Sequence, residues 1–321
     1  MELNFMNRSK LRFKHGIHIA AALLLGSMLL HVPMANAKFL AVTVSSEDNF
    51  RNLLSSSIEK AVDDRRDDVY IDSAENNFAV QVQQIESYIK AGADAIIIFP
   101  CGTPEQNESL FKYAEKVPLV FINTEPTDDL EGMPRNTIYV GSNELESGTM
   151  QMEELARLAG YKGKIALMMG DMNHKAARTR TQDVDDVVAK YPNLTVIKRE
   201  SGFWQRNKGY KIVSDWIKQG VDFDILLGNN DEMIIGGIMA LRDAGKDPKK
   251  YLTGGVDATK DALIDMSKGD LDVTVLQDAV GQGRAAVEMA YKMINGERVK
   301  SPHWVPFKLV TKDNYQQFVK D

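Results

Sequence analysis

Polar side chains follow most of the apolar runs of this sequence, at the points where strands are expected to end. In the stretch 223–237, FDILLGNNDEMIIGG, Asn229, Asn230 and Asp231 separate a continuous apolar run from a second one spaced like a helix. The pattern predicts a buried parallel strand, a turn, and a helix with Asp231 as N-cap and Glu232 in its first turn. Ligands of open α/β sheets bind at this edge. An alternative interpretation is that these residues only cap and turn the chain.

Similar residues follow the other apolar runs. The complete set is Asp48, Asn49, Phe50, Asn123, Glu125, His174, Arg178, Trp204, Asn230, Asp257 and Gln277. Carboxylates and amides accept and donate hydrogen bonds, an arginine grips two neighbouring hydroxyls, and aromatic faces cover C–H surfaces. These are the requirements of a neutral polyol or sugar, so the set predicts a ligand-binding cleft.

Each member of the set also has a purely structural interpretation. The aromatic residues Phe50 and Trp204 would then belong to the core. Asp257 would cap a helix, and Asn123 and Glu125 would serve a turn. The basic residues His174 and Arg178 would be solvated. No single member is specific, and it is their joint placement at strand ends that favours a ligand site.

The elements that would position these residues alternate between strand and helix from Phe39 onward. The predicted strands are 39–45, 69–72, 94–99, 118–123 and 137–141, followed by a second series at 164–170, 195–198, 225–227, 251–257 and 272–278. This alternation predicts a mostly parallel sheet in each half of the chain. The 284 residues after position 37 are more than one core usually supports, so we expect two lobes.

The first 37 residues have the pattern of a secretory signal. Residues 8–14 carry four basic side chains, residues 17–30 are mainly apolar, and the tripeptide at 35–37, Ala-Asn-Ala, is a small-x-small cleavage site. The alternative is an uncleaved membrane anchor, but this apolar run is short of the roughly 20 residues that a membrane span needs. We therefore predict a cleaved signal and an exported protein.

Charge and cysteine content exclude several functions. The chain has a formal charge of −6, and removing a leader with four basic residues and one acidic residue leaves −9, which is unfavourable for nucleic-acid binding. Cys101 is the only cysteine, so no intramolecular disulfide forms, and no histidine nearby makes it a nucleophile. The sequence holds no metal-ligand cluster, P-loop or nucleophile elbow. We expect no metal, no cofactor and no enzymatic activity.

Several motifs together resemble the periplasmic monosaccharide-binding proteins of ABC importers, of the ribose- and galactose-binding type, over residues 39–321. They are DNF (48–50), FINTEP (121–126), YVGSNELESG (139–148), AARTR (176–180), GNNDEM (228–233), GVDAT (255–259) and TVLQDA (274–279). The resemblance implies an α/β fold of the type I periplasmic binding protein class, with two Rossmann-like lobes joined by a three-segment hinge near Ser142, Asp278 and Lys300. The expected division is signal peptide 1–37, first lobe 38–142 plus 278–300, and second lobe 143–277 plus 301–321.

The resemblance also implies roles for the site residues. Phe50 and Trp204 sandwich a sugar ring, and the hydroxyls are bonded by Asp48, Arg178, Asn230, Asp257 and Gln277. Segments 170–181, 203–209, 269–279 and 303–311 look most like the inositol- and rhizopine-binding branch. Two departures from the galactose-binding pattern argue against a hexose. Residues 159–164 replace a calcium loop, and Phe99 replaces a ligand-binding asparagine.

We therefore predict a monomeric substrate-binding protein that captures a sugar or cyclitol between its lobes and delivers it to an inner-membrane permease. One alternative is a sensory protein that presents its ligand to a chemoreceptor or kinase. Another is a glycan-processing enzyme, which would need two carboxylates about 5 to 9 Å apart, such as Asp48 with Asp257 or Glu125. A transcription regulator of the same fold is disfavoured by the export signal.

Overall fold

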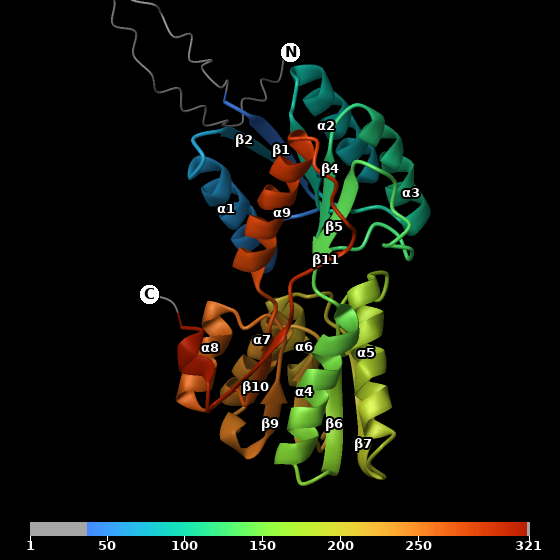
Figure 1. The fold of residues 1–321 in the computed structure, drawn as a ribbon. Coiled ribbons are helices and arrows are strands. Elements are labelled where there is room, and N and C mark those ends of the chain that lie inside the picture. The colour runs from blue at the N-terminus through green and yellow to red at the C-terminus, as the bar shows by residue number, and fades with distance from the viewer. Residues whose placement is uncertain (1–36, 320–321) are drawn as a thin grey trace, which may run out of the picture. The chain divides into compact units, whose positions relative to one another are not determined.

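The structure is a computed structural model that describes residues 37–319, so the predicted signal segment lies outside it except for Ala37. Two six-stranded sheets organise the described residues, one in each half of the chain. Figure 1 shows helices on both faces of each sheet. No helix within residues 37–319 is long and apolar enough to span a bilayer. The predicted architecture of two α/β lobes with mostly parallel sheets is confirmed.

The first sheet has the strand order β11-β5-β4-β3-β1-β2, and all its pairings are parallel. Its elements are β1 (Phe39–Val44), α1 (Asn49–Asp63), β2 (Asp68–Ser73), α2 (Phe78–Ala91), β3 (Ala95–Ile98), α3 (Pro104–Glu108), β4 (Leu119–Ile122), β5 (Thr137–Gly141), α9 (Ala279–Ile294) and β11 (His303–Trp304). A 3₁₀ helix at Ser109–Glu115 follows α3. Every residue of β3, β4 and β5 is buried, as expected for strands that are covered on both faces.

The second sheet has the order β12-β10-β9-β8-β6-β7. Its elements are α4 (Glu144–Leu158), β6 (Lys162–Met169), α5 (Lys175–Val188), β7 (Asn193–Ser201), α6 (Arg206–Lys218), β8 (Ile225–Gly228), α7 (Asp231–Asp243), β9 (Leu252–Gly254), α8 (Lys260–Lys268), β10 (Val273–Leu276) and β12 (Lys308–Thr311), with 3₁₀ turns at Pro248–Lys250 and Tyr315–Gln317. Only β12 runs antiparallel to its neighbour. The strand ends of the parallel series therefore share one edge.

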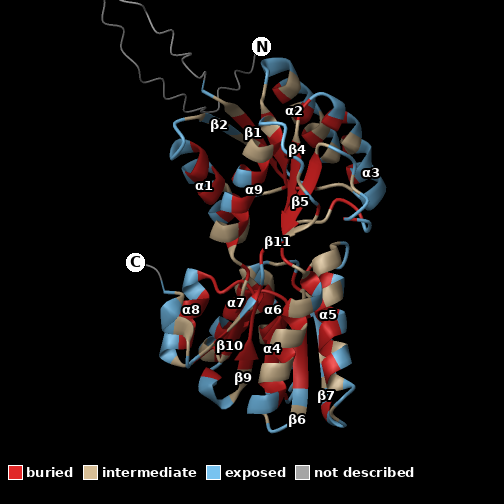
Figure 2. Cartoon of the chain, viewed as in Figure 1, coloured by how far each residue is buried: buried red, intermediate tan, exposed pale blue. Residues whose placement is uncertain are grey.

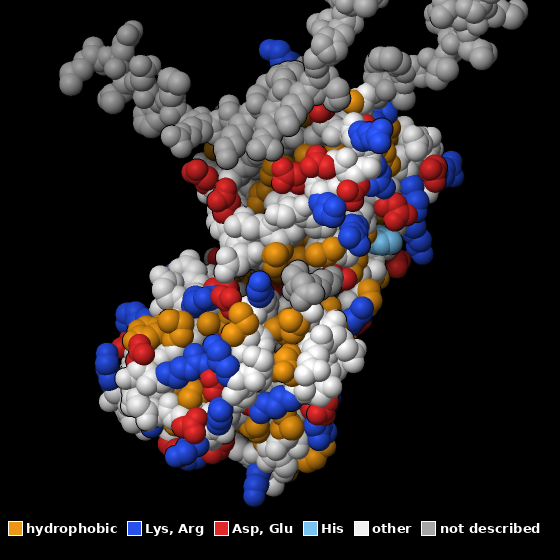
Figure 3. Space-filling model, turned by 90° about the vertical axis from the view of Figure 1, so that its left-hand side faces the viewer, with side chains coloured by type: hydrophobic (Ala, Val, Ile, Leu, Met, Phe, Trp, Pro, Cys, Tyr) orange, Lys and Arg blue, Asp and Glu red, His pale blue; other side chains and the backbone are white. Residues whose placement is uncertain are grey.

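Each sheet has an apolar core on both of its faces. In the first lobe, α1 and α9 cover one face around Leu54 and Ala286, while α2 covers the other around Ile85. In the second lobe, Trp216 of α6 lies in one core and Leu155 of α4 in the other. Figure 2 shows the buried residues concentrated on the strands and on the helix sides that face them. On the face viewed in Figure 3, side chains of both charge signs are interspersed over both lobes.

The chain passes between the two sheets three times. The crossings lie between β5 and α4, between β10 and α9, and between β11 and β12. The Ser142 hydroxyl of the first crossing donates to the Val305 carbonyl of the third at 2.7 Å and accepts from Nε2 of Gln282, in the first turn of α9, at 2.9 Å. The last crossing differs from the expected one near Lys300. His303 pairs with Val140 in the first sheet, so the chain leaves that sheet only after β11.

Candidate functional site

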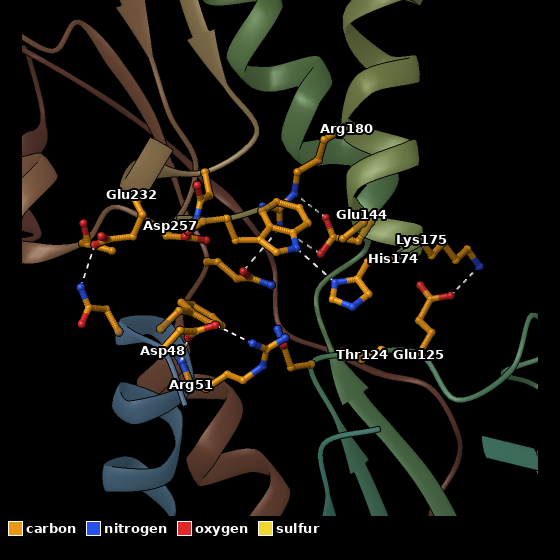
Figure 4. A pocket seen from close by; sticks show the side chains of 18 residues that line it. Asp48, Arg51, Thr124, Glu125, Glu144, His174, Lys175, Arg180, Glu232 and Asp257 are labelled. Atoms are coloured by element: carbon orange, nitrogen blue, oxygen red, sulfur yellow. Dashed lines mark hydrogen bonds and ion pairs between the residues drawn. The ribbon is translucent and has the colours of Figure 1, made fainter. Parts of the chain in front are cut away.

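One pocket gathers side chains from the strand ends of both sheets. It is lined by Asp48, Asn49, Phe50, Arg51, Asn123, Thr124, Glu125, Glu144, His174, Lys175, Ala176, Arg180, Trp204, Asn230, Glu232, Asp257, Thr259 and Gln277. The pocket offers about 100 Å³ to the centres of water-sized molecules, where one water needs roughly 10 to 15 Å³ on that measure. It therefore has room for several waters or one small organic molecule. Figure 4 shows Asp48 and Arg51 entering from the α1 side, opposite Asp257 and Arg180.

Ten of the eleven predicted site residues line this pocket, and Arg178 is the exception. Arg178 is exposed, and its Nη1 donates to the backbone carbonyls of Met172 and Asn173 at 3.0 and 2.7 Å. Arg180 lines the pocket in its place. The helical repeat explains the exchange, because residues two positions apart face nearly opposite sides of α5, whereas Ala176 and Arg180 are four apart and share a face.

Eight lining residues were missed by the sequence analysis: Arg51, Thr124, Glu144, Lys175, Ala176, Arg180, Glu232 and Thr259. Seven of them lie within two positions of a predicted residue, so a wider window around each strand end would have found them. Glu144 carries no such signal and is identified only by its burial and by its ion pair with Arg180.

The start of α7 differs from the prediction. Asn230 is the N-cap, because its Oδ1 accepts from the Met233 amide at 3.1 Å. Asp231 is fully buried and accepts from the Thr259 amide and the Thr274 hydroxyl, both at 2.8 Å. Burial raises the pKa of Asp231 to about 7, while its bonds with Thr259 and Thr274 oppose the rise. Asp231 therefore ties the start of α7 to the start of α8 and to β10, and Asn230 lines the pocket.

Arg180 and Glu144 form a buried ion pair beside the pocket. Arg180 is 3% exposed, and its Nε and Nη2 donate to the two Glu144 oxygens at 2.8 and 3.1 Å. Its Nη1 donates to the Asn229 carbonyl at 2.8 Å, and its Nη2 lies 3.5 Å from Gln277 Oε1. Burial acts to lower the pKa of Arg180, but Glu144 and Asp257 raise it overall. Arg180 is thus a fixed cation that orients the Gln277 amide.

Asp257 and Gln277 each have a polar group at the pocket that lacks a hydrogen-bond partner among residues 37–319. Asp257 is 7% exposed, and its carboxylate accepts no hydrogen bond from any residue in the described range 37–319. It is not the N-cap of α8, since Thr259 fills that position. Burial raises the pKa of Asp257 well above the usual range, which Arg180 opposes and Asp231 reinforces. Gln277 Nε2 is likewise buried without a partner among these residues. Buried polar groups normally have partners, so this acceptor and donor are free to bond a polar molecule in the pocket.

Trp204 forms an aromatic wall of the pocket. A Cβ at Gly170 would overlap its ring, so the indole lies directly on the bare Gly170 backbone. The indole N–H donates to His174 Nδ1 at 3.1 Å, and the Arg180 guanidinium carbon lies 5.7 Å from the ring centroid. Phe50 lines the pocket from the first lobe. Both aromatic residues are partly buried. Each packs against a core cluster on one side and lines the pocket on the other.

Two polar contacts join the lobes at the pocket. Asn49 Nδ2 donates to Glu232 Oε1 at 2.8 Å, and Arg206 holds the two oxygens of Glu232 at 2.8 Å each. Lys175 Nζ lies 2.5 Å from Glu125 Oε2. Burial raises the pKa of Glu125, and Lys175 opposes the shift.

Replacing Gly170 with alanine is expected to weaken ligand binding about tenfold or more, because the new methyl group displaces the Trp204 ring. Isothermal titration of the variant measures the effect. Trp204→Ala removes the aromatic wall altogether, so it shows the largest loss of ligand affinity that displacing the ring can cause. In a Trp204→Ala background, Gly170→Ala should have no further effect. An equal loss in both backgrounds would show that Gly170 acts on something other than the indole.

Known proteins share this architecture. The family model described as "Periplasmic binding protein domain" matches residues 39–298. The chain belongs to this family. A Rhizobium meliloti protein named for rhizopine binding is 38% identical over 310 residues, which cover 94% of this chain and 97% of that one.

Solved structures agree with the family assignment. An ABC transporter solute-binding protein of Bacillus halodurans, solved with bound myo-inositol, is 31% identical with a TM-score of 0.81, covering 88% of this chain and 96% of the other. A solute-binding protein of Actinobacillus succinogenes, solved with D-allose, has a TM-score of 0.80 at 20% identity, covering 88% and 99%, and shares the fold. The predicted resemblance and the type I fold class are confirmed.

Proposed function

We propose that this protein is the substrate-binding component of an ABC importer and that it captures a cyclitol, or a sugar of similar size, in the pocket between its lobes. The observation that carries the proposal is a pair of groups at one wall without a hydrogen-bond partner among residues 37–319, the Asp257 carboxylate and the Gln277 amide nitrogen. A carboxylate that accepts and an amide that donates match adjacent hydroxyls. The Trp204 ring beside them suits the C–H face of a ring-shaped polyol.

Charge pairing in the pocket supports an uncharged ligand. Four of its five carboxylates already have a basic partner: Asp48 with Arg51, Glu125 with Lys175, Glu144 with Arg180 and Glu232 with Arg206. These pairs need no charge from the ligand, and their oxygens keep lone pairs for hydroxyl groups. We propose that the protein binds without catalysis, because four of the carboxylates are held in ion pairs.

A cyclitol is favoured over a pyranose for two reasons. The relatives above 30% identity include one named for rhizopine binding and one solved with myo-inositol. Phe99, where the galactose-binding pattern has a ligand-binding asparagine, is 1% exposed and belongs to the first-lobe core. In this proposal Phe50 and Trp204 cover the two ring faces. Asp48, Asn49, Asn123, Glu125, Asn230, Asp257 and Gln277 supply hydrogen bonds to the ligand.

A thermal-shift panel tests the ligand. The protein from residue 38 onward, refolded to remove bound ligand, is heated with myo-inositol, scyllo-inositol, galactose, glucose, ribose, arabinose or xylose. A ligand at 100 times its dissociation constant adds about 2.7 kcal/mol to the stability. We expect a shift with a cyclitol. A shift with a pyranose alone would contradict the cyclitol preference, and no shift with any compound would contradict the proposed ligand class.

The proposed location is the periplasm and the proposed partner is an inner-membrane permease. Deleting the gene should abolish uptake of the radiolabelled ligand by cells. Normal uptake together with lost chemotaxis toward the ligand would instead indicate a sensory role. The lobes are proposed to close about the three crossings, and ligand binding would shift that equilibrium.

A further inference from the structure

The Trp204 wall is held in an uncommon backbone conformation. Phe203 and Trp204 have φ angles of +52° and +67°, and bulky residues rarely occupy this left-handed region because it is strained for them. Such a conformation persists only where surrounding contacts enforce it. Around Trp204 those contacts are the Gly170 backbone, the Arg180 guanidinium, Asn230 Nδ2 on the Trp204 carbonyl at 3.4 Å, and the bond from the indole to His174.

The His174 side chain bonds Trp204 and does not cap its own helix, α5. It occupies the N-cap position of α5, where serine, threonine, aspartate and asparagine are preferred, yet its side chain makes no capping bond. Its ring instead lies within 14° of the indole plane and accepts the indole N–H on Nδ1. Because the indole nitrogen can only donate, Nδ1 carries no proton, and the proton of the neutral ring is on Nε2.

We propose that His174 is a positioning residue that fixes the Trp204 ring, and that protonation of its Nδ1 releases the ring and weakens capture of the ligand. The predicted effect of His174 protonation on ligand binding rests on the proposed function. The predicted effect on the position of the Trp204 ring rests only on the geometry of the loop. A protonated Nδ1 has no lone pair to accept the indole N–H and presents a second donor to it.

The surroundings of His174 determine the direction of the pH effect. Burial lowers the pKa of His174 below its ordinary value of 6.5; Asp171 and Asp48 oppose the shift, and Arg51 and Arg178 reinforce it. The ring is therefore neutral at pH 7. The hydrogen bond from the Trp204 indole to His174 is fully formed above the ordinary histidine pKa of 6.5, and it is lost as pH falls through the lowered pKa of His174. Affinity should follow the same course.

The loop that carries His174 is itself braced. The His174 amide donates to the Asp171 carbonyl at 2.8 Å, and the Asn173 amide donates to Asp171 Oδ1 at 3.0 Å. Arg178 donates to the carbonyls of Met172 and Asn173. Arg178 therefore supports the segment that presents His174 to the indole, which gives a structural role to an arginine that was expected to bind ligand.

Nuclear magnetic resonance of the indole groups tests the inference without a ligand. The chain has three tryptophans, and Trp204→Phe assigns the Trp204 indole resonance. Between about pH 8 and about pH 5 this resonance should titrate in the unmodified protein, with a midpoint below the ordinary histidine pKa. In His174→Gln it should stay constant, because the glutamine oxygen accepts at every pH. A Trp204 resonance that does not move, or that moves equally in His174→Gln, overturns the inference.

Binding measurements give the second readout. The affinity for myo-inositol, or for whichever compound in the panel binds, should fall at low pH by about two- to tenfold through His174. Asp231, Asp257 and Glu125 have raised pKa values and add their own acid sensitivity. His174→Gln should remove only the His174 part. In a Trp204→Phe background the same substitution should change nothing, and a change there would mean that His174 contacts the ligand itself.

The two failures can be told apart. If no compound binds at about pH 8, the proposed function fails while the indole titration still decides the role of His174. If ligand binds and its pH profile is the same in His174→Gln as in the unmodified protein, the inference fails and the proposed function remains.

Discussion

Replacing Asp257 with asparagine is expected to weaken ligand binding about a hundredfold and, at neutral pH, to stabilise the ligand-free protein. Hydrogen bonds to a charged group contribute about 1.5 to 3 kcal/mol each, and the two carboxylate oxygens can each accept from a different ligand hydroxyl. In the absence of ligand the same carboxylate is buried without a partner in the described structure. Its replacement by a neutral amide removes the unfavourable burial of charge.

The stability change has a defined pH dependence. Burial raises the pKa of Asp257 above its ordinary value of 3.8, so the unfolded chain releases this proton at a lower pH than the folded protein does. The carboxylate therefore destabilises the fold increasingly as pH rises from the ordinary value to the raised one. We expect Asp257→Asn to melt at a higher temperature than the unmodified protein at neutral pH and at the same temperature near about pH 3.

Isothermal titration and thermal unfolding across pH measure the two effects. Asp222→Asn is the matched control, since this aspartate is 84% exposed and lies in the same lobe. It should change neither quantity appreciably. Unchanged affinity in Asp257→Asn would remove this residue from the site. A melting temperature that falls at neutral pH would show that the carboxylate has a stabilising partner.

Replacing Arg180 with methionine is expected to destabilise the protein by about 3 to 5 kcal/mol and to abolish binding, whereas Arg178→Met should do neither. Removing Arg180 leaves Glu144 as a buried, unpaired charge with 7% of its side chain exposed, and breaking a buried pair in this way costs about that much. It also frees the Gln277 amide. Arg178 is exposed and donates to two loop carbonyls, so its loss should cost about 1 kcal/mol or less.

Urea unfolding of the two variants gives the comparison, and the double variant Glu144→Gln with Arg180→Met sharpens it. With the unpaired charge removed, much of the stability should return, while binding stays lost because the Gln277 amide remains unoriented. Equal destabilisation by Arg178→Met and Arg180→Met would contradict the assigned roles. Full stability in Arg180→Met would show that Glu144 is solvated.

The sequence by itself determined the alternation of strand and helix and the edge of the sheets at which the pocket lies. Fully covered strands such as Ala95–Ile98 require continuous apolar residues, and helix starts and turns require polar ones. These requirements are local, so a few neighbouring residues in the sequence are enough to reveal them. Because parallel strands point their carboxyl ends the same way, polar residues such as Asp257 and Gln277 had to lie near one another.

Only the tertiary structure decided which of these side chains face the pocket and which support it. Arg178 and Arg180 are chemically identical, and the phase at which α5 packs on the sheet directs Arg180 inward, to Glu144 and Gln277. Similarly, the choice of Asn230 over Asp231 as N-cap depends on Thr259, the N-cap of α8, and on Thr274 of β10. Such choices rest on contacts between residues distant in sequence, and these contacts exist only once the sheets and helices have packed.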